Sequence, residues 1–175
     1  MEEILRDRNR QLEKTELIGL CRKDMELLSS YYQKEITAMH IAVRTSLPDN
    51  PLFIDGNAEQ LGKTIMSLLN NGMYAIAKKY GKKAYPAEIG LALESKDGQV
   101  VIRLYDNGVG IEQSILDKIF DPFFTTKTTG EAAGIGLYLS KEIILNHHGQ
   151  IAVRSEKDEL TEFTITLPLW EEKSV

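Results

Sequence analysis

The sequence predicts an α+β protein in which helices cover one face of a β-sheet. In some segments apolar residues recur every three or four positions, which is the period of an amphipathic helix. In others they alternate with polar residues, as in strands with one buried face. The pair Asp97-Gly98 lies between two alternating segments and is a strong β-hairpin signal. This order of helices and hairpin-linked strands favours a helix layer packed on a sheet.

The first part of the chain is predicted to contain a charged N-terminal segment, a helix and a strand. Residues 1–14 carry many charges, so we expect an exposed helix or linker that continues from an upstream segment. Apolar residues at helical spacing over 15–35 predict an amphipathic helix, with Cys21 as a small core residue. Alternation over 41–47 predicts a strand.

A second helix is predicted to begin at Asn57, which can cap it, with Gln60 in the capping-box position. Beside its apolar stripe lies a polar stripe at helical spacing, made of Ser67, Asn71, Tyr74 and Lys78. This stripe is either the wall of a cleft or a solvated helix face, and the helix pattern alone favours the solvated face.

The second part of the chain is predicted to add two pairs of strands to the sheet, with two helices between the pairs. The expected elements are a hairpin of strands over 89–93 and 100–104, a short helix over 112–119, a helix over 136–147 and two final strands over 151–153 and 163–167. The hairpin delivers Asp106 at its end. Gly149 is expected to end the last helix in the left-handed conformation.

The stretch from Asp106 to Leu137 holds the residues that point to a function. It contains two glycine-bearing turns that flank the aromatic run FDPFFTTK at 120–127. Glycine lets a backbone or a phosphate approach closely, and the N–H groups at a helix start can bind an anion. We therefore expect this stretch to wrap a nucleotide.

Composition limits the class of protein. A net charge of −5 argues against a broad nucleic-acid surface, and a single cysteine rules out an internal disulfide. No apolar run is long enough to span a bilayer, and no signal peptide is visible at the start. We expect a cytoplasmic protein, associated with a membrane only through absent upstream segments.

Four motifs in this order resemble the ATP-binding domain of sensor histidine kinases, which belongs to the GHKL superfamily with the DNA gyrase, MutL and chaperone ATPases. They are Asn71, DNGVGI at 106–111, FDPFFTTK at 120–127 and GIGL at 134–137. The resemblance covers about 15–170, leaving 171–175 as a tail. It implies a Bergerat fold, in which three helices cover one face of a mixed, mostly antiparallel sheet and ATP lies between a helix and a mobile lid.

The resemblance also implies a role for each matching residue. Asp106 would accept a hydrogen bond from the adenine amine, and Gly108 and Gly110 would let the backbone pass close to the base. Asn71 would bind Mg²⁺ together with phosphate oxygens and water. The second glycine box, which is GIGL at 134–137, would contact the phosphates through Gly134, Ile135, Gly136 and Leu137. Lys127, in the lid, would contact them through its charge. The catalytic residues would be Asn71 and Lys127. Phe120, Phe123 and Phe124 are expected to anchor the lid in the core, and the last two to offer an anchor for a partner helix.

Two positions depart from the family pattern. Ser67 stands where the kinases often have a second asparagine, and the ATPase relatives place a water-activating glutamate near this position. Serine cannot act as that base, so phosphoryl transfer to an outside nucleophile is favoured over hydrolysis. Ala132 replaces the first glycine of the second box. These departures leave open a nucleotide-binding module with little turnover.

The phosphoacceptor is expected to lie on another domain. His40, His147 and His148 all lack a following acidic residue and are expected to have structural or surface roles. The expected partners are a histidine-bearing dimerisation hairpin upstream of this chain and the receiver domain of a response regulator. A serine kinase of the anti-sigma type shares the fold and is the remaining alternative, although FDPFFTTK argues against it.

Overall fold

The computed structural model describes residues 12–124 and 137–172. In chain order its elements are β1 (Glu13–Glu16), α2 (Leu17–Tyr31), α3 (Gln33–Ala38), β2 (Ala42–Ser46), β3 (Phe53–Gly56), α4 (Ala58–Tyr80), β4 (Glu88–Lys96), β5 (Gln99–Asp106), α5 (Gln113–Leu116), α6 (Tyr138–Asn146), β6 (Gln150–Glu156) and β7 (Leu160–Pro168). None of the described helices has the length and apolar character needed to cross a bilayer.

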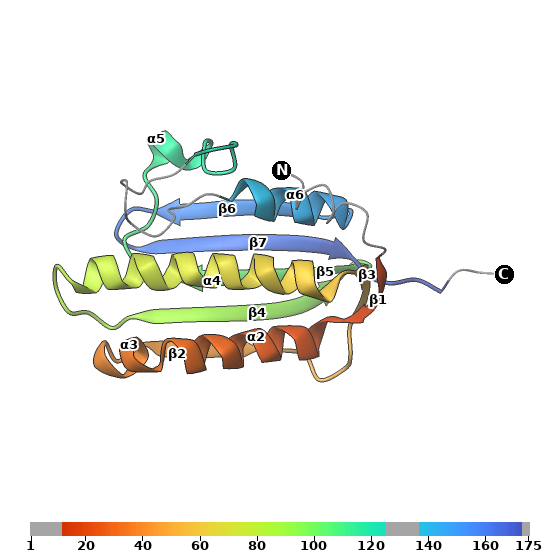
Figure 1. Ribbon diagram of the computed structural model, residues 1–175, viewed down its shortest axis with the longest axis horizontal. Helices are drawn as coiled ribbons and strands as arrows, with labels where there is room; N and C mark the ends of the chain where they lie inside the picture. The colour runs from red at the N-terminus through yellow and green to blue at the C-terminus, as the bar shows by residue number, and fades with distance from the viewer. Residues whose placement is uncertain (1–11, 125–136, 173–175) are drawn as a thin grey trace.

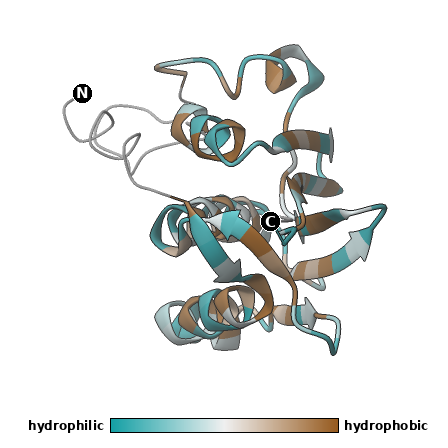
Figure 2. Cartoon of the chain, turned by 90° about the vertical axis from the view of Figure 1, so that its right-hand side faces the viewer, coloured by the Kyte–Doolittle hydropathy of each residue, from teal (hydrophilic) through white to brown (hydrophobic). Residues whose placement is uncertain are grey.

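Five strands form the main sheet, in the order β2-β4-β5-β7-β6. Only β2 and β4 run parallel, and the other neighbours are antiparallel. Helices α2, α4 and α6 lie side by side on one face of this sheet (Figures 1 and 2). The predicted α+β architecture is therefore confirmed, including the hairpin at Asp97-Gly98, where both residues have positive φ.

Helix α4 lies at the centre of the helix layer and follows its predicted pattern closely. The Asn57 side chain accepts a hydrogen bond from the backbone N–H of Gln60 at 3.0 Å, as expected of an N-cap. The apolar stripe of the helix is buried against the sheet and its neighbouring helices, and its members include Leu61, Ile65, Leu68, Leu69 and Ile76. Cys21 of α2 is also fully buried, as predicted.

The start of the chain differs from the prediction. Residues 13–16 form β1, which pairs antiparallel with β3, instead of belonging to a linker and a helix. The strand therefore crosses the predicted domain boundary between residues 14 and 15. The predicted helix over 15–35 begins at Leu17 and gives way after Tyr31 to the separate short helix α3. Local periodicity could not reveal β1, because its partner strand lies about forty residues away.

The two ends of the described fold meet at β1 and β3. The ammonium group of Lys14 lies 4.6 Å from the ring centroid of Phe53 and 4.0 Å from that of Trp170, which are cation–π distances. The backbone N–H of Trp170 donates to the carbonyl of Phe53 at 2.8 Å. The beginning and the end of the fold are thereby fastened to each other at one end of the sheet (Figure 1).

The end of α6 also differs from the prediction. His148, with φ of 59°, takes the left-handed conformation that was expected at Gly149. A Cβ at Gly149 would lie 2.5 Å from the carbonyl oxygen of Thr166 and 2.6 Å from a methyl of Leu167. Gly149 is therefore required by close contact with β7, which the local sequence does not show.

Candidate functional site

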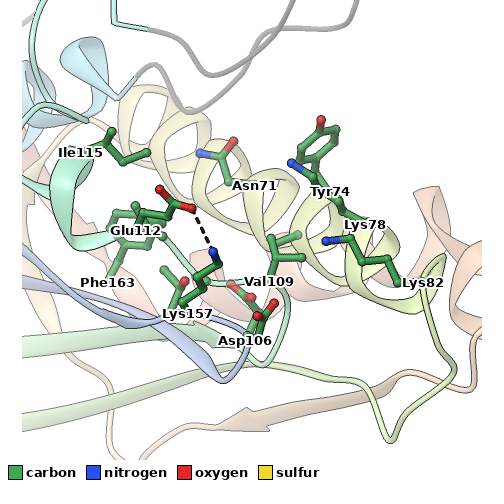
Figure 3. A pocket seen from close by; sticks show the side chains of 15 residues that line it. Asn71, Tyr74, Lys78, Lys82, Asp106, Val109, Glu112, Ile115, Lys157 and Phe163 are labelled. Atoms are coloured by element: carbon green, nitrogen blue, oxygen red, sulfur yellow. Dashed lines mark hydrogen bonds and ion pairs between the residues drawn. The ribbon is translucent and has the colours of Figure 1, made fainter.

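A cavity of about 300 Å³ lies between the second half of α4, the end of β5 and the turn that joins β6 to β7 (Figure 3). Its lining residues are Asn71, Tyr74, Ala75, Lys78, Lys82, Asp106, Val109, Gly110, Ile111, Glu112, Ile115, Lys157, Asp158, Thr161 and Phe163. The set combines an apolar wall, one buried carboxylate and several lysines. Such a combination suits a flat, partly apolar ligand with an anionic end.

Asp106 is the buried polar group of this cavity, with 5% of its surface exposed. It ends β5, and one carboxylate oxygen accepts a hydrogen bond from the backbone N–H of Gly108 at 2.9 Å. Burial raises the pKa of Asp106 to about 7, although the Gly108 hydrogen bond and the charge of Lys79 both act to lower it. A buried carboxylate beside an open cavity is well suited to accept a hydrogen bond from a ligand amine.

The polar stripe of α4 lines this cavity for most of its length. Asn71, Tyr74 and Lys78 are lining residues, whereas Ser67 is not among them. Figure 3 shows Asn71 and Tyr74 projecting from α4 on the cavity side. At these three residues the stripe is therefore the wall of a cleft, and Tyr74 and Lys78 are also exposed to solvent, as the solvated-face interpretation expected.

Lysines lie around the cavity, and the sequence did not single them all out. Lys78 and Lys82 come from the end of α4 and the loop after it, and Lys157 comes from the turn between β6 and β7. Lys157 forms an ion pair with Glu112 at 3.0 Å, and both side chains are largely exposed. Positive charge at the edge of a cavity attracts an anionic group such as a phosphate.

The first glycine turn packs tightly against two parts of the protein backbone. A Cβ at Gly108 would lie 2.4 Å from the carbonyl carbon of Ala75 in α4. Gly110 has φ of 70°, and a Cβ there would lie 2.3 Å from the carbonyl oxygen of Glu156. The glycines thus bring the turn close to α4 and to β6, and of the two only Gly110 lines the cavity.

Lys79 fastens this turn in place without lining the cavity. Its ammonium group donates to the backbone carbonyls of Asn107 and Asp158 and lies 4.3 Å from the ring centroid of Tyr85. The N–H of Asp158 in turn donates to the carbonyl of Val109. The end of α4, the glycine turn and the β6–β7 turn are therefore held as one unit.

Strand β7 supplies two lining residues that sequence reasoning missed. Thr161 lies opposite Asp106 in the antiparallel register of β5 and β7, and Phe163 follows two residues later on the same face. The alternating pattern that begins at Phe163 predicted a strand over 163–167, which left out Thr161, and the order of strands in the sheet was needed to place that strand beside Asp106.

The aromatic run divides into packed and exposed rings. Phe120 and Phe124 pack against the core, as predicted, and Phe120 meets Phe163 edge to face with ring centroids 6.4 Å apart. Phe123 is fully exposed, so the prediction that it belongs to the core is wrong. Its φ of 65° is unusual for an aromatic residue.

Several predicted site residues lie outside the described part of the chain. These are Lys127, Gly134, Ile135 and Gly136. Leu137 is described, and its side chain is fully buried while its N–H donates to the carbonyl of Ile119 at 3.3 Å. The roles given to these residues remain predictions.

The residues of the cavity fit an adenine nucleotide with a magnesium ion. Asp106 offers an acceptor for an amine, apolar groups such as Val109 and Ile111 offer surfaces for a ring, and the lysines offer positive charge for a phosphate chain. Among the described residues no group of three or more His, Cys, Asp or Glu side chains could hold a metal. A Mg²⁺ ion held by Asn71 would therefore take most of its ligands from phosphate oxygens and water, which is the usual arrangement for this ion.

Comparisons with known proteins show the family to which the chain belongs. Residues 56–171 match the family described as histidine kinase-, DNA gyrase B-, and HSP90-like ATPase. The two-component sensor PprA of Pseudomonas aeruginosa is 33% identical over 74% of this chain and 14% of its own length. The signal transduction histidine-protein kinase AtoS of Escherichia coli is 39% identical over 69% of this chain and 19% of its own.

A solved structure gives the same fold. The catalytic domain of histidine kinase ThkA superposes with a TM-score of 0.70 at 23% identity, covering 90% of this chain and 96% of that domain. The chain thus spans less than one fifth of PprA and of AtoS, but nearly all of this catalytic domain.

Proposed function

The chain belongs to the family of histidine kinase-, DNA gyrase B- and HSP90-like ATPases, and we propose that it is the ATP-binding catalytic domain of a two-component sensor histidine kinase. In this role it binds Mg-ATP and transfers the γ-phosphoryl group to a histidine on a separate dimerisation domain, for relay to a response-regulator aspartate. The similarity to PprA and AtoS supports this assignment.

The buried carboxylate of Asp106 is the observation that carries the proposal. It is the one cavity-lining carboxylate, among the described residues, that is not exposed to solvent. An ionised carboxylate only accepts hydrogen bonds, so it suits the 6-amine of adenine and repels the 6-oxo group of guanine. Asp106 is therefore the residue expected to make the chain bind ATP in preference to GTP.

Asn71 and the lysines act on the phosphate end of the nucleotide. Asn71 would hold Mg²⁺ through its amide oxygen, while Lys78 and Lys82 would attract and orient phosphate oxygens. Lys127 is proposed as a further phosphate contact from the lid. When bound, Mg-ATP supplies the phosphoryl group and the charge that neutralises it during transfer.

Transfer is favoured over hydrolysis by the chemistry of the α4 wall. The described part of α4 contributes Asn71, Tyr74, Ala75 and Lys78 to the cavity, and none of them is a carboxylate. Ser67 lies near the position at which the ATPase relatives are expected to carry a glutamate. Without a general base on this wall, a water molecule there is not activated.

The accepting histidine is proposed to lie outside the described cavity and on another domain. His147 is buried and donates or accepts hydrogen bonds through both ring nitrogens, which is a structural role. His40 and His148 are exposed and lie outside the cavity lining. A histidine-bearing hairpin is therefore the proposed partner of the cavity, and the receiver domain follows it in the relay.

Phe123 is the proposed contact for that hairpin. Its ring is fully exposed and its backbone has a positive φ, and neither feature is stabilising. Covering such an exposed aromatic ring with a partner helix would stabilise the complex, because it removes apolar surface from water.

The proposed setting is the cytoplasm, where the single buried thiol of Cys21 stays reduced.

The test is a transfer assay with radiolabelled ATP, the isolated chain and a supplied dimerisation hairpin. We expect no stable phosphohistidine on the chain alone, and acid-labile label on the hairpin after mixing. Asn71→Ala should abolish labelling. Asn70→Ala is the matched control, because Asn70 precedes it on α4 but does not line the cavity. Phe123→Ala should reduce labelling without changing nucleotide affinity.

Other outcomes assign the chain elsewhere. Acid-labile phosphate on the isolated chain would contradict the separate acceptor. Rapid hydrolysis without transfer would move the protein to the ATPase branch, and ATP binding with neither reaction would indicate a nucleotide-binding module, which Ser67 and Ala132 left open. Acid-stable phosphate on an added protein would indicate a serine kinase.

A further inference from the structure

Ser155 of β6 lies behind the cavity and is 3% exposed. Its hydroxyl oxygen has three polar neighbours, each at 2.8 Å: the backbone N–H of Ile111, the carbonyl of Leu160 and the hydroxyl of Thr161. Ser155 does not line the cavity, whereas Ile111 and Thr161 do.

The direction of these hydrogen bonds follows from the chemistry of the groups. The N–H of Ile111 can only donate and the carbonyl of Leu160 can only accept. The single hydrogen of the Ser155 hydroxyl is therefore used by Leu160. The contact between the two hydroxyls can then be a hydrogen bond only if Thr161 donates to Ser155, so the hydrogen of Thr161 points away from the cavity.

Thr161 consequently offers only lone pairs to a ligand. It lies directly across from Asp106 in the β5–β7 register, and residues paired in this way project from the same face of a sheet. Both line the cavity. Two acceptors thus stand side by side on neighbouring strands.

We propose that Ser155 is a positioning residue that fixes the Thr161 hydroxyl as an acceptor, so that Thr161 and Asp106 together select a purine 6-amine over a 6-oxo group. This inference rests on the proposed nucleotide-binding function. A 6-amine has two hydrogens and satisfies both acceptors, whereas a 6-oxo group has only lone pairs and is repelled by both. Without the Ser155 hydroxyl, the hydrogen of Thr161 is free to rotate toward a 6-oxo group.

A purely structural role for Ser155 makes a different prediction. Ser155 also holds the glycine turn through the N–H of Ile111. If this were its whole effect, removing the Ser155 hydroxyl would lower the binding affinity of every purine nucleotide by the same factor. The ratio of affinities for two purines therefore separates positioning from support.

The experiment measures the affinities of ADP and inosine diphosphate, which has a 6-oxo group in place of the amine, by calorimetry at pH 8. Ser155→Ala should lower the ADP-to-IDP affinity ratio about tenfold, the size expected for one hydrogen bond gained or lost. Ser155→Thr keeps the hydroxyl and should restore the ratio. In a Thr161→Val background, Ser155→Ala should leave the ratio unchanged, because no hydroxyl remains to be oriented.

Equal weakening of ADP and IDP by Ser155→Ala would overturn the inference and leave the proposed function intact. If Ser155→Ala does not fold, Thr161→Val decides the matter, since loss of the acceptor must lower the ratio and an unchanged ratio overturns the inference. Failure of the unaltered chain to bind either nucleotide would overturn the proposed function and this inference together.

Discussion

The Nε2 atom of His147 accepts a hydrogen bond from the backbone N–H of Asn57 at 3.0 Å, which joins the end of α6 to the start of α4. The Nδ1 atom lies 2.7 Å from the carbonyl of Ile143, so Nδ1 carries the proton and the ring is neutral. Burial is the main cause of the lowered pKa of His147.

This arrangement predicts a loss of stability in acid. Because the pKa of His147 is lower in the folded chain, the unfolded chain takes up the proton first, and the free energy of unfolding falls as pH drops below about 6.5. His147→Gln should cost about 1–2 kcal/mol at pH 7.5 through lost hydrogen bonds, and should show a shallower decline down to pH 5.5. Urea unfolding at several pH values measures both.

The control for this prediction is a histidine that does not act on His147. His40→Asn changes an exposed histidine, and asparagine tolerates the positive φ of this position. It should keep the decline seen in the unaltered chain. A decline in His147→Gln as steep as in His40→Asn would show that His147 does not titrate in this range.

Asp106 predicts that nucleotide affinity depends on pH, because the ionised carboxylate is the form that binds the base. The pKa of Asp106 is raised to about 7, so affinity for ADP should rise as pH increases from 6 to 8 and then level off. Asp106→Asn should weaken binding at pH 8 by about tenfold to a hundredfold, and the residual affinity should not vary with pH. Calorimetry at each pH tests both statements.

Asp158→Asn is the matched variant, because Asp158 also lines the cavity but is exposed, and its positive φ accepts asparagine. It should preserve the pH profile of the unaltered chain. A profile that is flat before any substitution would mean that Asp106 is not the group that meets the base.

The close packing of Gly110 against β6 predicts that adding one methyl group there greatly lowers the free energy of unfolding. Gly110→Ala places a Cβ 2.3 Å from the carbonyl oxygen of Glu156 at a φ of 70°. Gly98 has a φ of 74° but nothing within 4 Å of its Cβ position. Gly98→Ala should therefore cost about 1 kcal/mol from backbone strain alone, and Gly110→Ala more than about 3 kcal/mol, as measured by urea unfolding. Similar losses of unfolding free energy in the two variants would show that β6 moves aside for the added methyl group at little cost.

Asn71 predicts a separation of metal binding from base recognition. Asn71→Ala should remove most of the gain in ADP affinity that Mg²⁺ provides, while metal-free ADP binding changes little. Asn70→Ala should retain the full gain. Calorimetry with Mg²⁺ and with a chelator makes the comparison, and an equal loss in both conditions would assign Asn71 a structural role.

The parts of this molecule that could be read from the sequence are those whose signals are local. Helix α4 was identified because its cap, its apolar stripe and its polar stripe all lie within one segment. Asp106 was placed correctly at a strand end, because the hairpin turn Asp97-Gly98 sets the register that delivers it. Both are short-range features of the chain.

The parts that were missed depend on distant partners. Strand β1 exists because β3 pairs with it, and Gly149 is glycine because β7 passes close to it. Thr161 and Lys157 reach the cavity only because β7 lies next to β5 in the sheet. No local pattern around these residues carries that information.

The Lys14 clamp between Phe53 and Trp170 has a mechanical consequence. Helix α4 starts beside this clamp and runs 23 residues toward the cavity, a length of about 35 Å at roughly 1.5 Å per residue. A segment that continued from β1 or from Trp170 would therefore join the domain at the end opposite the cavity. A rotation of about 10° at the clamp would carry the cavity end of α4 through about 6 Å, given its length. If the proposed acceptor domain were joined there, a small rotation at the clamp would move the cavity toward the acceptor or away from it.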